Sequence, residues 1–213
     1  MDRPTGVECA LFDFDGTLAD TEAYNMRILA SICRKFGVEP TISELGSIAS
    51  SSGEETVPAL FAGHGREVSA EEFFSDWSDN KDVYYELPLK IAPGVEGLLG
   101  RIRTRGVRTC VVSTTEADRL EAALGRTGMR GYFDDVVGWE ATERHKPDPD
   151  PYLEGLRRMG ADAFRSVVFE DSPAGVRAGK AAGAYVFGCH CLSTKFDVSA
   201  ADEVIDTFEG LEL

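Results

Sequence analysis

The stretch from Cys9 to Asp20, CALFDFDGTLAD, brings two carboxylates to the end of an apolar run. Cys9 to Phe12 has the pattern of a buried strand in a parallel sheet that is covered on both faces. Asp13 and Asp15 follow two positions apart, so in an extended backbone both side chains point to the same side. Gly16 then permits a turn and lets a ligand approach the main chain. Two such carboxylates require a positive partner, and Mg²⁺ is the usual one where phosphate is handled.

Two simpler interpretations explain this stretch less well. A calcium-binding loop also begins with Asp-x-Asp, but it needs glycine at its sixth position and glutamate at its twelfth. Here the glycine is fourth and the twelfth residue is Tyr24. The two acids could instead cap the next helix, but Asp20 can do so alone, which leaves Asp13 and Asp15 unexplained. A catalytic or metal-binding role is therefore favoured.

Polar residues also follow other predicted strands. One strand ends in Ser113 and Thr114, another ends in Glu170 and Asp171, and Lys146 lies in a loop before a helix. Taken singly, each has an ordinary explanation as a helix cap, a solvated lysine or an acidic first turn. Gathered at one edge of one sheet, they supply a nucleophile, metal ligands, donors for phosphate oxygens and an acid for the leaving group. Phosphoryl transfer requires this set.

An α/β fold is expected to position these residues. Apolar runs predict strands at residues 9–12, 107–113, 136–137, 166–169, 184–187 and 204–205, with helical segments between them from residue 93 onward. Strands separated by helices of this length form a parallel sheet with right-handed crossovers. Such a sheet collects its functional residues at the carboxyl ends of its strands.

In residues 19–88 the sequence pattern predicts helices and no convincing strand. We interpret them as a helical domain inserted into a discontinuous core made of residues 1–18 and 89–213. A Ser-rich link is expected from Ser47 to Ser52, and the last helix of the insertion is expected to run to about Leu87.

The starts of the helices are predicted from side chains that accept hydrogen bonds from the first free backbone amides. The predicted caps are Asp20, Ser52 with Glu55, Ser69 with Glu72, Thr115 with Asp118, Asp150 before Pro151, and Ser172 before Pro173.

Composition limits the classes of partner. The 213-residue chain has 37 acidic and 22 basic residues, a formal net charge of −15, which argues against nucleic acid and anionic membranes. The sequence contains no apolar stretch typical of a signal peptide or a membrane span. Its five irregularly spaced cysteines indicate reduced thiols. We expect a cytoplasmic monomer.

The motifs DFDGTLAD, VVST, HKPDPDPY and FEDSPAGVRAGKAAG together resemble the haloacid dehalogenase superfamily of phosphotransferases. They are most similar to the branch with a helical cap inserted after the first motif, which includes small-molecule phosphatases and β-phosphoglucomutase. The resemblance covers the chain from Cys9 to about Gly188. It implies a Rossmann-like core, with the helical insertion acting as a mobile lid.

The resemblance also implies roles for the motif residues. Asp13 would be the nucleophile and a metal ligand. Asp15 would be the general acid and base, and its backbone carbonyl would also bind Mg²⁺. Ser113 would bind the transferring phosphoryl group, and Lys146 would hold both that group and the Asp13 carboxylate. The remaining metal ligands would be Asp171 and, directly or through water, Glu170.

Substrate contacts are less well defined by the sequence. In the core, Gly16 and Thr114 are candidates. In the insertion, the candidates are Tyr24, Asn25, Ser50, Ser51 and Lys81.

The resemblance implies hydrolysis of a small phosphorylated metabolite of the sugar phosphate, polyol phosphate or phosphoglycolate type, through an aspartyl phosphate. A sugar-phosphate mutase is the alternative. Those mutases carry His in the first cap helix and Arg in the following cap loop, where this chain has Asn25 and the uncharged stretch Ala49 to Gly53. Lys81, followed by Tyr85, does match a cap lysine of the mutases.

Two other classes of protein fit these residues less well. Halide release needs no proton, so Asp15 argues against a dehalogenase. A non-catalytic Mg²⁺- or phosphate-binding protein would be expected to have lost a motif residue, and none is lost.

As an exposed loop lysine, Lys146 should be replaceable by alanine at little cost in stability but at a severe cost in activity.

Overall fold

The computed structural model describes residues 1–49, 53–76, 82–86, 88–193 and 195–213. The chain divides into two compact units, one made of Met1–Thr21 with Pro88–Leu213 and the other made of Glu22–Leu87. In the described part of the chain, none of the helices combines the length and the apolar character that a membrane crossing requires.

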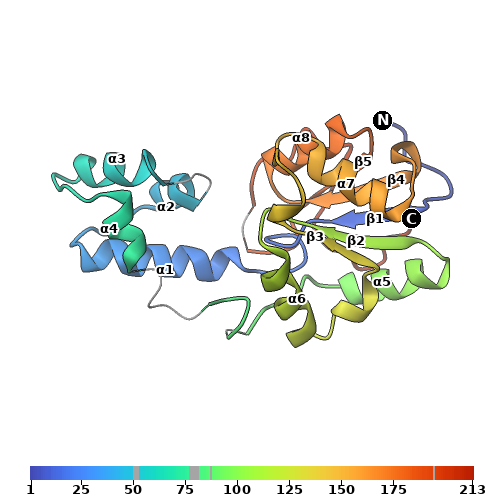
Figure 1. The fold of residues 1–213 in the computed structure, drawn as a ribbon, viewed down its shortest axis with the longest axis horizontal. Coiled ribbons are helices and arrows are strands. Elements are labelled where there is room, and N and C mark those ends of the chain that lie inside the picture. Colours follow the sequence, from blue (N-terminus) through green and yellow to red (C-terminus); the bar gives the residue numbers. More distant parts are fainter. Residues whose placement is uncertain (50–52, 77–81, 87, 194) are drawn as a thin grey trace. The chain divides into compact units, whose positions relative to one another are not determined.

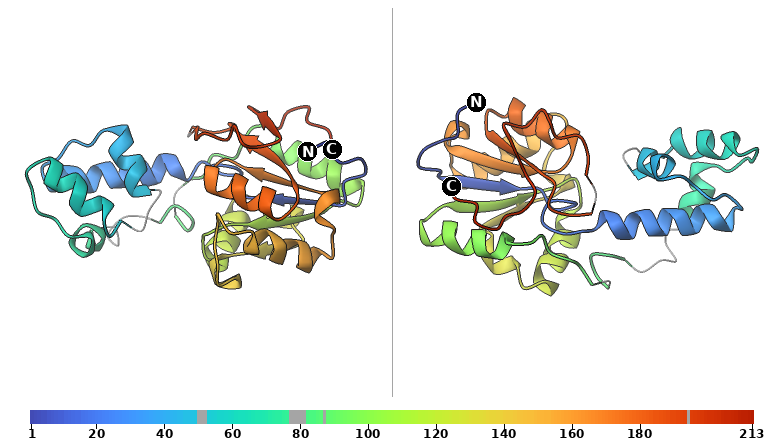
Figure 2. Two further views of the ribbon diagram at one scale, coloured as in Figure 1. Left: turned by 90° about the horizontal axis from the view of Figure 1, so that it is seen from above. Right: turned by 180° about the vertical axis from the view of Figure 1, so that it is seen from behind.

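A parallel sheet forms the centre of the larger unit (Figures 1 and 2). All its strand pairs are parallel, in the spatial order β3-β2-β1-β4-β5-β6. The predicted Rossmann-like α/β core is confirmed. In sequence order the strands are β1 (Cys9–Phe12), β2 (Arg108–Val112), β3 (Asp135–Val137), β4 (Ser166–Glu170), β5 (Tyr185–Cys189) and β6 (Glu203–Ile205).

Helices cover both faces of this sheet, as crossovers between parallel strands require. One face carries α7 (Asp150–Met159) and α8 (Pro173–Ala181), and the other carries α5 (Val95–Thr104) and α6 (Ala117–Arg126) (Figure 1). Short 3₁₀ helices at Arg130–Tyr132, Trp139–Ala141 and Ala163–Arg165 lie in the connections.

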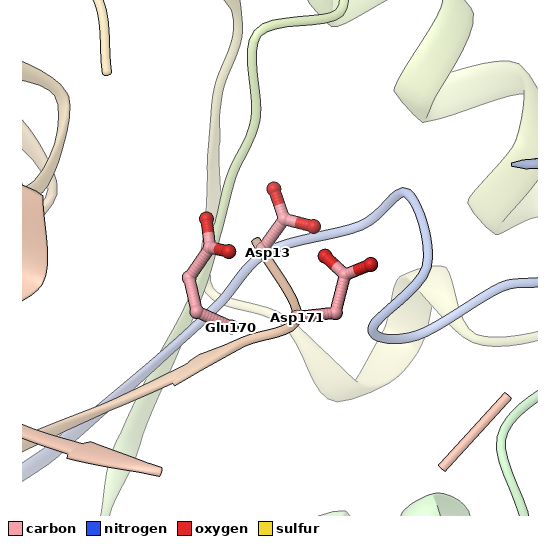
Figure 3. A group of neighbouring side chains, drawn as sticks. All are labelled: Asp13, Glu170 and Asp171. Carbon is pink, nitrogen blue, oxygen red and sulfur yellow. The ribbon is translucent and has the colours of Figure 1, made fainter. Parts of the chain in front are cut away.

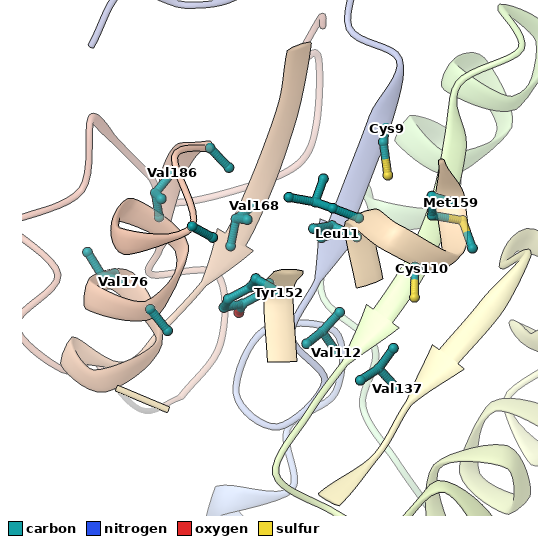
Figure 4. Close-up of a cluster of buried hydrophobic side chains, with 14 of the residues drawn as sticks. Cys9, Leu11, Cys110, Val112, Val137, Tyr152, Met159, Val168, Val176 and Val186 are labelled. Carbon is teal, nitrogen blue, oxygen red and sulfur yellow. The ribbon is translucent and has the colours of Figure 1, made fainter. Parts of the chain in front are cut away.

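The core extends over both faces because every residue of β1 is buried. Cys9 and Leu11 belong to an apolar cluster that also contains side chains of α7 and α8 (Figure 4). Phe12 has the opposite orientation in the strand and stacks on Phe169, which stacks on Phe187; the ring centroids are 4.6 and 4.9 Å apart. Dense packing on both sides fixes the carboxyl ends of β1 and β4, where the polar motif residues begin.

In its described residues, the smaller unit contains helices joined by turns and loops, and no strand. Leu29, Ile32, Phe61 and Phe73 are buried in one apolar cluster of this unit. Its helices are α1 (Glu22–Lys35), α2 (Ile42–Ala49), α3 (Thr56–Gly63) and α4 (Ala70–Ser75).

Helix α2 was not expected. The predicted polar link begins at Ser47, but this residue lies inside α2. Leu45 and Ile48 are buried in the cluster of the smaller unit, so tertiary packing outweighs the weak helix propensity of the glycine and serines in this segment.

Two predicted N-caps are confirmed. Ser69 accepts a hydrogen bond from the backbone amide of Glu72 (3.1 Å) at the start of α4. Ser172 accepts one from the amide of Gly175 (3.0 Å) at the start of α8. In both cases the cap needs only residues three positions apart, so the sequence alone identifies it.

The helix that Ser69 opens is shorter than predicted, because α4 ends at Ser75 and does not reach Leu87. Residues 83–86 form a turn. The carboxylate of Asp82 accepts a hydrogen bond from the amide of Tyr84 (2.8 Å), an arrangement that favours a turn over a helix.

Two other predicted caps make long-range contacts instead. The carboxylate of Asp20 accepts a hydrogen bond from the hydroxyl of Ser193 and does not cap α1. The hydroxyl of Thr115 donates to the Asp15 carboxylate, and α6 begins without a side-chain cap. Each prediction failed because a residue more than 90 positions away in sequence competes with the helix amides.

The predicted caps Asp150 and Glu55 are also wrong. Asp150 is the first residue of α7, and its carboxylate lies 2.9 Å from the guanidinium of Arg144. Glu55 precedes α3 without making a capping hydrogen bond, and its predicted partner Ser52 lies outside the described residues.

Candidate active site

The predicted site residues of the core lie at the carboxyl edge of the sheet. Asp13 directly follows β1, Ser113 follows β2, and Glu170 is the last residue of β4. The strand hydrogen bonding continues into the site, because the Asp13 amide donates to the Phe169 carbonyl (3.0 Å) and the Ser113 amide donates to the Val137 carbonyl (3.0 Å). The backbone of the site is therefore held by the sheet.

Three buried carboxylates form a cluster at this edge (Figure 3). Asp13, Glu170 and Asp171 each place an oxygen within 4.8 Å of the others, and their exposures are 6%, 1% and 3%. Like charges this close and this far from water need a positive partner. Carboxylate oxygens are the ligands that a hard divalent cation prefers, so this donor set fits such an ion.

Two glycines make room for these carboxylates. Gly16 has a φ of +82°, and a Cβ atom there would lie 2.1 Å from Oδ2 of Asp171. A Cβ atom on Gly175 would lie 1.6 Å from Oε1 of Glu170. Any other residue at either position would displace a carboxylate of the cluster.

Lys146 is buried, contrary to the expectation of an exposed loop lysine. Its side chain is 5% exposed. Its ammonium donates to Asp13 Oδ1 (2.6 Å), Glu170 Oε1 (2.7 Å) and the Val112 carbonyl (2.9 Å), which uses all three of its protons. The prediction that alanine at this position costs little stability therefore had a wrong premise, because the lysine is not exposed.

The charges of the site do not balance among the residues alone. Burial raises the pKa of Asp13 to about 8; the nearby Lys146 ammonium opposes this rise, and the Glu170 and Asp15 carboxylates add to it. Burial alone would lower the pKa of Lys146, but the carboxylates of Asp13 and Glu170 raise it above its ordinary value. Lys146 thus keeps its proton, and the cluster retains negative charge that a cation would offset.

Glu170 has four hydrogen-bond donors around its carboxylate. Oε1 accepts from the Lys146 ammonium and from the Tyr152 hydroxyl (3.0 Å). Oε2 accepts from the amide and from the hydroxyl of Ser172 (both 2.9 Å). Nothing in the position of Tyr152 along the sequence pointed to Glu170.

The Asp15 carboxylate lies outside the cluster and is surrounded by hydroxyls. Oδ1 accepts from the Thr21 hydroxyl (2.7 Å), and Oδ2 accepts from the hydroxyls of Ser113 (3.2 Å) and Thr115 (2.9 Å). The amide of Thr115 donates to the Ser113 hydroxyl (3.0 Å). Nothing in the sequence pointed to Thr21, and Thr115 was predicted to cap a helix. The signal for Thr115 was its position two residues after Ser113.

The other predicted substrate contacts lie outside the carboxylate cluster or outside the described residues. Thr114 is exposed directly after Ser113. Tyr24 and Asn25 lie in α1, within the smaller unit, and both are half-buried. Ser50, Ser51 and Lys81 lie outside the described residues.

The sequence model of the haloacid dehalogenase-like hydrolase family matches residues 10–189. The chain is 32% identical over 201 residues to the validoxylamine A 7'-phosphate phosphatase of Streptomyces hygroscopicus subsp. limoneus, covering 91% of this chain and 89% of that protein. It is 28% identical to the bifunctional riboflavin kinase/FMN phosphatase of Arabidopsis thaliana. That match covers 96% of this chain but 54% of the relative, so the chain spans about half of that protein's length.

A solved structure agrees with these sequence matches. A Thermotoga maritima protein provisionally named β-phosphoglucomutase aligns with a TM-score of 0.76 and 29% identity, covering 95% of each chain. The chain therefore belongs to the haloacid dehalogenase-like hydrolase family, in its phosphatase and β-phosphoglucomutase-like branch, and is an enzyme of the phosphoric monoester hydrolase class.

Proposed function

We propose that this enzyme is a Mg²⁺-dependent phosphatase that hydrolyses a small phosphomonoester through an aspartyl phosphate on Asp13. The observation that carries the proposal is the contact between the buried Asp13 carboxylate and the Lys146 ammonium, next to the carboxylates of Glu170 and Asp171. A nucleophile beside a fixed cation and a set of metal-type ligands meets the needs of phosphoryl transfer.

The proposed reaction has two displacements at phosphorus. In the first, a carboxylate oxygen of Asp13 bonds to phosphorus as the bond to the substrate alcohol breaks, and Asp15 gives its proton to the departing oxygen. In the second, Asp15 takes a proton from water, whose oxygen bonds to phosphorus as the bond to Asp13 breaks. The hydroxyls of Thr21, Ser113 and Thr115 hold Asp15 beside the site until it acts.

Asp13 and Asp171 would hold the cation, with Glu170 binding it directly or through water. When bound, Mg²⁺ supplies positive charge that offsets the charge of the phosphoryl oxygens. The Lys146 ammonium supplies further positive charge, held in place by the protein, at the Asp13 carboxylate. The raised pKa of Asp13 supports a role for both charges, since the nucleophile must be ionised to act.

We expect Mg²⁺ to stabilise the folded protein more strongly as pH rises. The folded-state pKa of Asp13, about 8, lies above its unfolded value, so its contribution to stability is fully present below about pH 4 and is lost as pH rises through about 8. Mg²⁺ competes with this proton, so its stabilising effect should be smallest at low pH. Thermal unfolding in EDTA and in excess Mg²⁺, measured from about pH 6 to about pH 9, checks this.

Asp13→Asn is the control, because its amide cannot take up this proton, and the Mg²⁺ shift should be small and nearly independent of pH. A wild-type Mg²⁺ shift that stays constant over the same pH range would contradict both the cation site and the charge state assigned to Asp13.

The substrate class is proposed from the relatives, whose names identify phosphatases of small phosphate esters. We expect phosphate release from sugar phosphates, polyol phosphates, phosphoglycolate or FMN, without stimulation by a sugar bisphosphate. A panel of these esters with Mg²⁺, assayed for inorganic phosphate, tests this. Conversion of β-glucose 1-phosphate to glucose 6-phosphate faster than phosphate release would assign the chain to the mutases instead. The roles of Asn25 and Lys81 remain predictions.

A further inference from the structure

The side chain of Tyr152 lies directly against the catalytic lysine. Tyr152 belongs to α7 and has no exposed surface. Its hydroxyl donates to Oε1 of Glu170 (3.0 Å), the same oxygen that accepts from the Lys146 ammonium (2.7 Å). The Lys146 nitrogen also lies 4.9 Å from the centroid of the Tyr152 ring, within the range of a cation–π contact.

Packing alone does not account for the hydroxyl. The Tyr152 ring lies among apolar neighbours that include Leu11, Val112 and Val176 (Figure 4). A phenylalanine would fill this space equally well and would leave no buried polar group to satisfy. The hydroxyl is therefore explained by its bond to Glu170 and not by the core.

Helix α7 holds Tyr152 in a fixed position relative to the sheet. A Cβ atom at Gly155, one turn further along the helix, would lie 3.1 Å from a methyl of Val112 and 3.2 Å from a methyl of Leu11. The helix thus packs closely on β1 and β2, the strands that lead to Asp13 and Ser113. A group fixed to α7 is fixed to the site.

We propose that Tyr152 is a positioning residue for Lys146, acting through Glu170; this inference rests on the proposed function. Its hydroxyl and the two Ser172 donors hold the Glu170 carboxylate in the orientation that accepts from Lys146. The Tyr152 ring also contacts the ammonium and limits its movement. These contacts keep the Lys146 ammonium in place beside Asp13, the residue to which the phosphoryl group is transferred.

Tyr152→Phe tests this, because it removes one oxygen atom and keeps the ring. We expect kcat to fall about tenfold with KM changed less than about twofold, since a hydrogen bond to a charged group is lost and the fixed lysine matters most in the transition state. The matched control is Tyr185→Phe. Tyr185 is 5% exposed and donates to Glu203 (3.1 Å) at the amino end of β5, away from the site. Its kcat should not change.

A second measurement does not depend on turnover. The buried Lys146 ammonium, with three acceptors, should give a resolved side-chain resonance in ¹H–¹⁵N spectra of the full chain, assigned by its absence in Lys146→Met. Tyr152→Phe should shift or broaden it, and Tyr185→Phe should leave it in place.

These readouts separate the two proposals. A wild type that releases no phosphate from any ester would end the proposed function, while the Lys146 resonance would still test Tyr152. An unchanged kcat, or an unchanged Lys146 resonance, in a folded Tyr152→Phe variant would overturn the positioning role. A loss of stability in Tyr152→Phe no larger than in Tyr185→Phe, together with the tenfold fall in kcat, would support it.

Discussion

Asp13→Asn should abolish turnover and leave the protein folded. The amide has nearly the same shape as the carboxylate but cannot form an acyl phosphate, so we expect kcat to fall by at least about 10⁴-fold. In the metal-free protein Asp13 is a buried carboxylate beside Glu170 and Asp15, which disfavours its charge. Removing that charge relieves this repulsion, and Lys146 keeps its contacts with Glu170 and the Val112 carbonyl, so the melting temperature in EDTA should change little. Steady-state kinetics and thermal unfolding of the same preparation check both expectations.

A surface carboxylate provides the control for this variant. Asp206 is 79% exposed and lies 3.7 Å from the Lys195 ammonium. Asp206→Asn makes the same chemical change and should alter neither kcat nor the melting temperature. Retention of more than about one per cent of wild-type kcat in Asp13→Asn would rule out Asp13 as the nucleophile. An enzyme that has lost its nucleophile has no other reaction route of comparable rate.

Lys146→Ala should impair both catalysis and stability. It removes the ammonium that contacts Asp13 and Glu170, so we expect kcat to fall about 10²- to 10³-fold, as for other fixed donors at a transition state. Breaking a buried ion pair from one side costs about 3–5 kcal/mol in the free energy of unfolding. Denaturant unfolding and kinetics at matched pH measure the two effects.

The pH dependence of Lys146→Ala identifies the cause of its instability. Without the ammonium, the folded-state pKa of Asp13 rises further above its unfolded value. The loss of stability relative to wild type should therefore be small at about pH 4 to 5 and should grow as pH rises. Lys146→Met, which fills most of the space, should show the same trend. An equal loss at every pH would indicate a packing defect instead.

Lys195→Ala is the matched control, since Lys195 is 59% exposed and forms a surface ion pair with Asp206 at 3.7 Å. It should change stability little and activity not at all. Near-normal catalysis in Lys146→Ala would show that the ammonium has no part in the reaction.

The sequence by itself determined the secondary elements whose signals are local and the edge at which the site lies. Four consecutive apolar residues before Asp13 predicted β1, and the serines at 69 and 172 predicted caps that bond three residues ahead. The order of strands and helices predicted a parallel sheet, whose carboxyl ends must gather the polar motif residues. The candidate residues Asp13, Ser113, Lys146 and Glu170 follow from that single rule together with the resemblance.

Only the tertiary structure decided how these residues are partnered. Lys146 is buried because Asp13, 133 residues away in sequence, and Glu170 surround its ammonium. Thr115 leaves its predicted cap because Asp15, 100 residues away, accepts its hydroxyl proton. The sequence specifies the donors and acceptors of a site, but one carboxylate has many possible donors in the chain. The packing of α7 and of the strands selects which of them come within hydrogen-bond distance, because burial leaves no water to satisfy the alternatives.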